Sequence, residues 1–491
     1  MTTVQKAITA ILVTVLIAIF LIALALQGDV ADLPLEQTAG TDPVLAEEES
    51  EIIPTVAIAE PVGWASGEQP IAAPGLEVNR FADNLDHPRV IYTLSNGDVL
   101  VTLTRSPGFK PGDDDGGVFA TIRSWVESLL FSQAGAAGAS PNQLVLLRDT
   151  NEDGRADRRF VLTDELDSPS GIAWQDNTLF VANHDEVLTF PYNLGDTSLG
   201  SPPTKLMDLP PGGGHWMRNI KLGPAGRYLY VAVGSVSNIG ESGMEVEEGR
   251  AMIWRYDLET GRQSMFAAGL RNPNGLDFSP WTGELWTTVN ERDMLGSDLV
   301  PDYLTNVPIG AQYGWPWLYW RDNIDQRVDA PMPQYLMEYT RRPEYALGAH
   351  VAPLGFVFTE EGSRMGDNFP GGAFVANHGS WNRKPPSGYN VVFVNFDENG
   401  NPQGLPKTVL GGFLQDDGTT RGRPTWVAWS QDGALLVTDD TAGIIWRVVD
   451  PNAKPASAIA RVERGRLQAP SQLQDPEAAR REAYARETME N

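Results

Sequence analysis

The chain has 491 residues and a formal net charge of −27, which argues against nucleic acid and anionic lipid surfaces as partners. It contains no cysteine, which excludes disulfides, thiolate metal sites and a cysteine nucleophile. Hydrophobic residues make up 42% of the chain, enough for a substantial core, and 49 Gly and 36 Pro favour many turns between short strands.

The N-terminus carries an apolar segment at residues 8–26, long enough for the hydrocarbon core of about 30 Å. The apolar part of a cleaved signal is usually shorter, so we expect residues 1–26 to form an uncleaved signal anchor. Cleavage after Ala23-Leu24-Ala25 is the alternative. In both cases the remainder is exported, on the periplasmic side of the inner membrane or free in the periplasm.

Residues 27–75 are acidic and proline-bearing and contain no Lys or Arg. This composition predicts an extended linker between the membrane and a globular domain. At the other end, residues 451–491 are polar with mixed charge, which predicts a frayed helix or disorder.

Between these ends, residues 76–450 show a loose repeat in which an apolar run, a polar turn and a second strand recur, often followed by a third strand. Six first strands begin near Arg89, Ser170, Arg218, Asn274, Pro353 and Pro424. Paired strands at this spacing predict an all-β chain folded as a six-bladed β-propeller, with a sandwich as the alternative. In a propeller, loops that are distant in sequence meet at the mouth of the central channel.

Two insertions interrupt the repeat. Residues 106–141 contain an amphipathic stretch, 118–131, with apolar positions at helical spacing, which predicts a short helix packed on the propeller. Residues 292–349 are rich in Trp and Tyr and predict long functional loops.

A histidine heads the third unit, because Gly212-Gly213-Gly214 is followed directly by His215 and then by the strand-like run 228–233. Histidine suits a general base near neutral pH. Other polar residues stand at the same place ahead of their units, and with His215 they form one candidate set: Arg218, Arg271, Asn272, His350, Arg421 and Arg423. Arg forks bind carboxylates, so the set predicts a planar polyanionic ligand; pairing with nearby Asp is the alternative.

This constellation suits the oxidation of an alcohol by hydride transfer. Neutral His215 could take the hydroxyl proton. No side chain in the chain could accept the electrons, so a cofactor must carry them. A hard cation would polarise the accepting carbonyl of such a cofactor.

Taken together and in order, six motifs resemble the soluble pyrroloquinoline quinone (PQQ)-dependent glucose dehydrogenases and L-sorbosone dehydrogenases. They are GGGHWMRNIKLGP, GLRNPNGLDF, WTTVNERDMLGSDLVPDYL with YGWPW, AHVAPLGFVF, FVANHGSWNR and RGRPTWVAWSQDGALLVTDDTAG. The resemblance covers residues 80–450, and by the stretch His378 to Arg383 the chain is most similar to the sorbosone-type branch.

The resemblance implies a six-bladed propeller that holds PQQ and Ca²⁺ on its top face, with His215 as the catalytic base. It assigns cofactor contacts to Arg271, Asn272, His350, Arg421 and Arg423, and calcium ligation to the backbone carbonyls of Glu291 and Arg292. The expected activity is PQQ-dependent oxidation of a sugar or a sugar-derived alcohol or aldehyde, with a quinone or cytochrome as electron acceptor. The alternatives are a binding or scaffold propeller without PQQ, and a calcium-dependent lactone hydrolase.

Two departures from the glucose enzymes bear on the substrate. Pro169-Ser170 stands where those enzymes place a Gln-Asn pair, and Gly234-Ser235 stands where they place an Asp. The second change removes an expected partner of the imidazole, which makes glucose a doubtful substrate.

A second candidate calcium loop comprises Asp149, Asn151, Asp153 and Asp157, with glycine at its sixth position. Phe160 at the twelfth position excludes an EF-hand. A turn held by its own Asx hydrogen bonds is the alternative. We interpret the pair Asp439-Asp440 as a turn.

Overall fold

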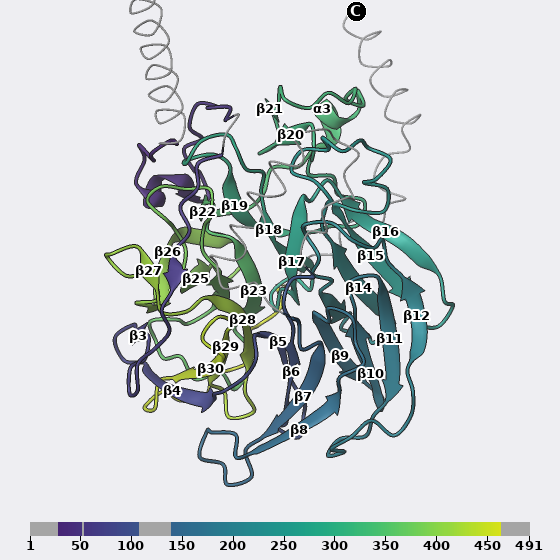
Figure 1. The fold of residues 1–491 in the computed structure, drawn as a ribbon, viewed down its shortest axis with the longest axis vertical. Helices are drawn as coiled ribbons and strands as arrows, with labels where there is room; N and C mark the ends of the chain where they lie inside the picture. The colour runs from purple at the N-terminus through teal and green to yellow at the C-terminus, as the bar shows by residue number, and fades with distance from the viewer. Residues whose placement is uncertain (1–27, 52–53, 108–138, 463–491) are drawn as a thin grey trace, which may run out of the picture.

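The structure is a computed structural model that describes residues 28–51, 54–107 and 139–462. Six antiparallel sheets stand around a central channel, so the chain is the six-bladed propeller that the sequence predicts (Figure 1). In each blade the first strand lies nearest the centre and the fourth lies at the rim.

Blades 1 to 3 follow one another along the chain. Blade 1 contains β5 (Pro88–Thr93), β6 (Val99–Leu103), β7 (Gln143–Arg148) and β8 (Arg158–Thr163). Blade 2 contains β9 (Gly171–Gln175), β10 (Thr178–Ala182), β11 (Glu186–Pro191) and β12 (Thr204–Asp208). Blade 3 contains β13 (Ile220–Leu222), β14 (Tyr228–Val233), β15 (Met252–Asp257) and β16 (Gln263–Ala268).

Blades 4 to 6 complete the ring. Blade 4 contains β17 (Asn272–Phe278), β18 (Leu285–Asn290), β19 (Pro301–Asn306) and β22 (Tyr345–Ala349). Blade 5 contains β23 (Pro353–Phe358), β24 (Gly372–Asn377), β25 (Asn390–Phe396) and β26 (Pro402–Gly411). Blade 6 contains β28 (Pro424–Trp429), β29 (Leu435–Asp439), β30 (Ile444–Val449) and β4 (Glu77–Ala82).

Strand β14 shows why these strands are apolar throughout. Successive side chains on a strand point to opposite faces. Leu229, Val231 and Val233 accordingly pack in the core shared with blade 2, whereas Tyr230 and Ala232 pack in the core shared with blade 4. Because neighbouring blades cover both faces, the strand needs no polar side.

The ring is closed by a strand from the beginning of the propeller segment. β4 pairs antiparallel with β30, and Ala82 lies opposite Ile445 while Glu77 lies opposite Val449. Every blade therefore has at least four strands, where the repeat predicted two or three. Residues 292–349 likewise supply β19 and β22 to blade 4, so the predicted insertion is in part a blade. Its remainder contains β20 (Leu318–Tyr319), β21 (Asn323–Ile324) and α3 (Leu336–Tyr339).

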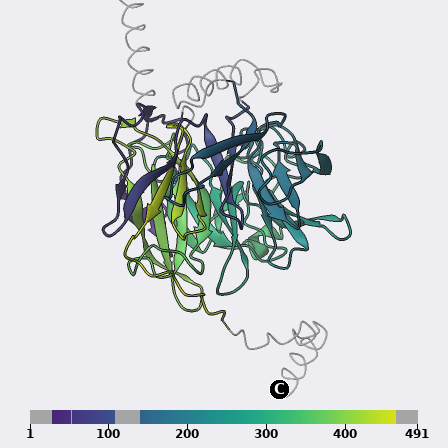
Figure 2. The ribbon, with the colours of Figure 1, turned by 90° about the horizontal axis from the view of Figure 1, so that it is seen from below.

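The described part of residues 28–75, which we call the N-terminal strap, packs on the propeller and is not the free tether expected from its composition. It contains η1 (Leu35–Thr38), β1 (Ala39–Gly40), β2 (Glu60–Pro61) and β3 (Ile71–Ala72). These strands pair with β22, β27 (Thr419–Thr420) and β26. Figure 2 shows the purple strap against the green and yellow blades. The reason is apolar contact: Ala59 is buried and Trp64 packs against the same core.

Three expectations lie outside the described residues: the apolar segment 8–26, the amphipathic stretch 118–131, and the tail beyond residue 462. Among the residues that the structure does describe, none of the helices has the length and apolar character needed to cross a bilayer.

Candidate active site

The loop ahead of β13 brings His215 to the top face, which we define as the face where first strands begin and second strands end. Gly212 and Gly213 adopt φ of 77° and 92°, values that favour glycine and form the turn before the imidazole. Gly234, at the end of β14, passes directly beside His215: a Cβ placed on it would lie 2.6 Å from the Cβ of His215 and 2.5 Å from Oδ1 of Asn272. His215 and Asn272 therefore meet across Gly234.

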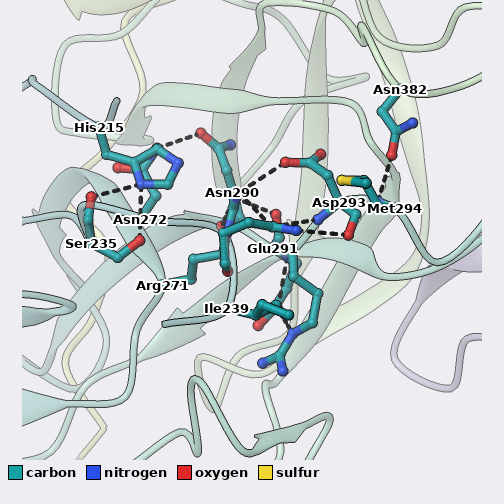
Figure 3. Close-up of polar contacts among 12 residues, drawn as sticks. His215, Ser235, Ile239, Arg271, Asn272, Asn290, Glu291, Asp293, Met294 and Asn382 are labelled. Atoms are coloured by element: carbon teal, nitrogen blue, oxygen red, sulfur yellow. Dashed lines mark hydrogen bonds and ion pairs between the residues drawn. The ribbon is translucent and has the colours of Figure 1, made fainter. Parts of the chain in front are cut away.

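The imidazole of His215 is fixed by Ser235. Its Nδ1 lies 2.9 Å from the backbone oxygen of Ser235 and 3.0 Å from the Ser235 hydroxyl, which itself donates to the carbonyl of Ser237 (Figure 3). A carbonyl only accepts, so Nδ1 carries the proton and Nε2 keeps its lone pair. Ser235 thus replaces the carboxylate whose loss was expected to leave the ring without a partner.

His215 is neutral at physiological pH. Burial lowers its pKa to about 3, the Arg271 charge acts in the same direction, and the Ser235 hydrogen bond and Asp293 oppose them. A neutral ring with a free Nε2 lone pair can accept a proton.

Arg271 is the centre of a hydrogen-bond network beside His215 (Figure 3). Its Nη2 lies 2.8 Å from the Asp293 carboxylate, and its Nη1 donates to the backbone carbonyl of Glu291 at 2.5 Å. Asn272 donates to the side chain of Asn290 at 3.1 Å. Burial works to raise the pKa of Asp293, but the charge of Arg271 and the hydrogen bond from His350 hold it below its usual value.

His350 lies behind Asp293. Its Nδ1 is 3.5 Å from the Asp293 carboxylate, and its Nε2 is 3.0 Å from the carbonyl of Leu299 and 3.1 Å from that of Gly296. Burial works to lower the pKa of His350, but the hydrogen bond and charge of Asp293 raise it overall. Since both ring nitrogens face acceptors of the chain, His350 positions Asp293, and through it Arg271.

Arg218 does not face the other candidates. Its guanidinium is fully buried and donates to the carbonyls of Pro210, Gly212, His215 and Met217. It therefore shapes the loop that presents His215. The sequence placed it beside the others because it shares their position ahead of a strand, but the tight turn directs its side chain into the loop itself.

The two arginines ahead of β28, Arg421 and Arg423, point to different parts of the structure. Arg423 is buried, donates from Nη2 to the Tyr389 hydroxyl at 2.8 Å, and lies over the Tyr389 ring at 5.0 Å. Its Nε has no hydrogen-bond partner among the described residues. Arg421 points to the N-terminal strap, where it pairs with Glu68 and lies over the Trp64 ring at 5.6 Å.

The backbone proposed to hold calcium lies at the end of β18. The Glu291 N–H donates to Asp302 at 2.7 Å, and the other oxygen of Asp302 accepts from the Ala352 N–H at 2.8 Å. The Glu291 carbonyl faces Arg271. The buried Arg292 side chain donates to the carbonyls of Pro316 and Leu318.

Asp440 is a residue that the sequence analysis underrated. One oxygen of this buried carboxylate lies 2.5 Å from Arg89 Nη1, 2.9 Å from His378 Nε2 and 3.5 Å from His87 Nε2. The expected simple turn is thus a hub that joins blades 1, 5 and 6. The sequence features that could have marked this hub are the histidine of NHGSW and the acidic pair of TDD, which both stand in the quoted motifs. Asn290 and Asp293 lie within a quoted motif but were given no role there, and Ser235 was noted only as a replacement for an Asp.

The candidate loop at residues 149–157 uses its oxygens internally. Asp149 accepts from the Gly154 N–H at 2.7 Å, Asn151 donates to Asp153 at 3.0 Å, and Asp157 accepts from Thr150. These contacts describe an Asx-held turn, and the calcium loop stays a prediction. Within the described ranges, no three His, Asp or Glu side chains gather as a metal-binding group.

The relatives of this chain include an uncharacterised protein and two named sugar dehydrogenases. An uncharacterised protein of Borreliella burgdorferi is 28% identical over 312 residues, which cover 59% of this chain and 77% of that protein. An aldose sugar dehydrogenase of Escherichia coli is 36% identical over 209 residues (41% and 45% covered). A pyrroloquinoline quinone-dependent pyranose dehydrogenase of Coprinopsis cinerea is 32% identical over 155 residues (28% and 20% covered). The match thus spans less than half of either named dehydrogenase.

Solved structures share the fold. A Trichoderma reesei protein of carbohydrate-active enzyme family AA12 superposes with a TM-score of 0.61 at 20% identity, covering 81% of this chain and 99% of that one. The holo PQQ domain of the Coprinopsis cinerea pyranose dehydrogenase gives 0.59 at 19% identity, covering 80% and 100%. The TrAA12-like family itself matches residues 129–308 and 333–451, which is more than half of the sequence. The chain belongs to the TrAA12-like family.

Proposed function

We propose that this protein is a PQQ-dependent oxidoreductase that oxidises a sugar or a sugar-derived alcohol or aldehyde, with His215 as general base. The observation that carries the proposal is the contact between His215 Nδ1 and the Ser235 carbonyl, which leaves Nε2 with a lone pair, on a residue that meets Asn272 across Gly234. The named relatives, a pyranose dehydrogenase and an aldose sugar dehydrogenase, support the substrate class.

The donor set on the top face fits PQQ, a planar tricarboxylic acid. Arg423 and Arg89 are buried, and the Nε atoms of both lack hydrogen-bond partners among the described residues. A buried donor without a partner is costly, and a carboxylate from a ligand would satisfy it. Arg271 and Asn272 stand on the opposite side of the channel, in blade 4.

In this proposal the side chains of the chain divide the work. His215 Nε2 accepts the proton of the substrate hydroxyl, and Ser235 keeps Nδ1 protonated throughout. Arg271, held by Asp293, binds an acidic group of the cofactor and keeps His215 neutral beforehand. An acidic ligand on Arg271 would weaken that charge and raise the proton affinity of His215. PQQ, when bound, supplies the acceptor for the two electrons.

Calcium is part of the proposal through the backbone carbonyls of Glu291 and Arg292, since backbone oxygens suit this cation. A calcium structure of the Trichoderma reesei AA12 protein supports a cation in such a fold. In this chain Arg271 already donates to the Glu291 carbonyl, so calcium binding requires that hydrogen bond to be replaced.

Two finer assignments also belong to the proposal. The sorbosone-type branch rests on the stretch from His378 to Arg383. Placement on the periplasmic side of the inner membrane, by an anchor at residues 8–26 or after cleavage, rests on the apolar N-terminus. Anchoring would place the propeller within reach of membrane electron acceptors.

Reconstitution tests the function. We expect PQQ added with CaCl₂ to the purified full-length protein to change its quinone absorbance and to support dye-coupled oxidation of an aldose panel. His215→Ala should lower kcat by about 10²–10⁴, the usual contribution of a general base, while the quinone still binds.

His184→Ala is the matched control, because His184 faces Asp167 and Asp185 in blade 2. It should turn over like the wild type. Wild-type kcat in His215→Ala would refute the base, and an unchanged quinone spectrum in the wild type would refute the cofactor.

A further inference from the structure

The opposite mouth of the central channel opens into a cavity of about 540 Å³. First strands or adjoining residues of all six blades line it, from β5 of blade 1 round to β28 of blade 6. Its volume falls within the range of about 300–1,000 Å³ that small-molecule sites occupy. The lining includes the ends of first strands, such as Thr93 and Gln175, whereas His215 and Arg423 precede theirs.

An apolar layer separates this cavity from the candidate active site. Trp216 and Met217, from the loop that presents His215, pack with Val90 and Trp426 inside the channel. Trp426 and Val90 are also part of the cavity wall. A ligand in the cavity would therefore occupy a site distinct from the one beside His215.

Two buried polar groups in the cavity wall lack partners. The Asn219 side chain is almost fully buried, and both its Nδ2 and its Oδ1 are without hydrogen bonds to described residues. Within the same described ranges, the Thr93 hydroxyl is buried and unpartnered too. Buried polar groups are nearly always hydrogen-bonded, because an unpaired one costs about 1–3 kcal/mol. Asn219 offers a donor and an acceptor together, and Thr93 offers a hydroxyl.

The charges of the cavity oppose an ionic ligand. Lys221 Nζ lies 2.9 Å from the Asp277 carboxylate, so these two charges compensate each other. Glu360 keeps contact with solvent at the mouth, yet the surrounding protein and Asp277 raise its pKa to about 7 against the opposing charge of Lys221. Glu361 adds a third carboxylate to the wall, so an anion would meet three carboxylates, and a cation would meet the ammonium of Lys221.

We infer that this cavity is a second binding site for a neutral polyhydroxy compound, a mono- or disaccharide, separate from the candidate active site. Hydroxyl groups both donate and accept, as Asn219 and Thr93 require. The partly exposed indoles of Trp174 and Trp426 add flat apolar surface to the wall, against which the C–H face of a sugar ring packs. The site rests on these residues and not on the proposed chemistry.

Isothermal titration of the full-length protein with D-glucose and with cellobiose, without added quinone or calcium, tests the site. We expect saturable binding of at least one of the two sugars. Thr93→Val keeps the branched shape and removes one hydroxyl, so Kd should rise about fivefold. Asn219→Leu removes two partners and should weaken binding more.

The matched control is Thr189→Val, the same change on β11, where the hydroxyl donates to Thr204 at the blade exterior. It should leave Kd unchanged, and so should His215→Ala, which separates this site from the proposed catalytic one. The inference would be overturned if neither D-glucose nor cellobiose bound. Equal Kd values for the wild type and Thr93→Val would overturn it too. Loss of binding in His215→Ala alone would assign the sugar to the top face.

Discussion

Two histidines of the top face have pKa values that are shifted in opposite directions. Burial and Arg271 lower the pKa of His215 to about 3, so its ring is neutral and its Nε2 accepts protons. Burial acts on His350 too, but the hydrogen bond to Asp293 raises its pKa overall. A single residue type thus serves as a candidate base in one position and as a hydrogen-bonding support for Asp293 in the other.

Arg423 and Arg421 allow a paired test of cofactor binding at the residue scale. Arg423→Ala should weaken PQQ binding by about one to two orders of magnitude, because a hydrogen bond to a charged group contributes about 1.5–3 kcal/mol. Arg423→Lys should recover only part, since an ammonium lacks the fork. Arg421→Ala should change affinity little, because Arg421 pairs with Glu68 of the strap. Titration of PQQ into folded protein measures all three, and unchanged affinity in Arg423→Ala would exclude it as a contact.

Asp302 should give stability a pH dependence of known sign. Burial raises its pKa from the ordinary 3.8 to about 7, against the opposing charge of His350. Between pH 4 and pH 7 the folded protein therefore keeps a proton on Asp302 that the unfolded chain has released, so this group makes the free energy of unfolding fall as pH rises.

The change is isolated by comparison with Asp302→Asn, which does not titrate. The unfolding free energy of the wild type minus that of the variant should decrease by about 2–4 kcal/mol from pH 4 to pH 7. Urea unfolding at each pH measures it, and a flat or rising difference would contradict the raised pKa.

At the scale of elements, the active-site geometry depends on how closely β14 and β17 approach beside the His215 loop. Asn272 opens β17, and His215 precedes β13 of the neighbouring blade. The backbone of Gly234 lies between their side chains, with room for hydrogen only. The register between blades 3 and 4 therefore sets the distance between the candidate base and Asn272.

Gly234→Ala should disturb this contact. The added methyl carbon would lie within 2.6 Å of His215 and Asn272, so one of them must move, at a cost of about 1–3 kcal/mol. We expect a lower kcat and a lower thermal midpoint. Gly214→Ala is the control: it adjoins His215, its nearest contact would be 3.9 Å away, and its φ is not in the left-handed region. Equal activity of the two variants would show that the close approach is unimportant.

At the scale of the whole molecule, the N-terminal strap contacts blades 4, 5 and 6 and so adds connections between blades beyond those of the propeller repeat. It adds β1 to blade 4 and β3 to blade 5, and Trp64 reaches Asp439 of blade 6 at 2.9 Å. Trp64 also packs edge-on against Phe413 and Trp446, at 5.4 Å from each ring. The strap leads directly to β4, which closes the ring.

Truncation of Trp64 tests whether the strap is structural. Trp64→Ala should lower the free energy of unfolding by about 2–4 kcal/mol, because it removes a large ring and one of the hydrogen bonds that the buried Asp439 carboxylate accepts. Val62→Ala, at an exposed site of the same strap, should change it by less than about 0.5 kcal/mol. Chemical denaturation compares the two. Equal stability would mean that residues 28–75 behave as the free linker expected from composition.

The amino-acid sequence by itself determined the propeller and the location of the candidate site. Strands such as β14 are buried on both faces, so their apolar runs are visible without any partner, and turn residues separate them at regular spacing. His215, Arg271 and Arg423 were candidates because each stands ahead of a first strand and Asn272 opens one, and the topology brings those positions to one face.

Only the tertiary structure decided which way side chains point and which distant segments meet. Arg218 and Arg421 occupy the expected loops but turn to backbone carbonyls and to Glu68, since the nearest acceptors fix a guanidinium. Four further features join residues whose contact depends on how the blades pack. They are the hydrogen bond from His215 to Ser235, the hub at Asp440, the N-terminal strap and the closure of the ring by β4. The local sequence pattern indicates the conformation of a single segment. These contacts depend instead on where other segments lie, and those positions are fixed only when the ring of blades is complete.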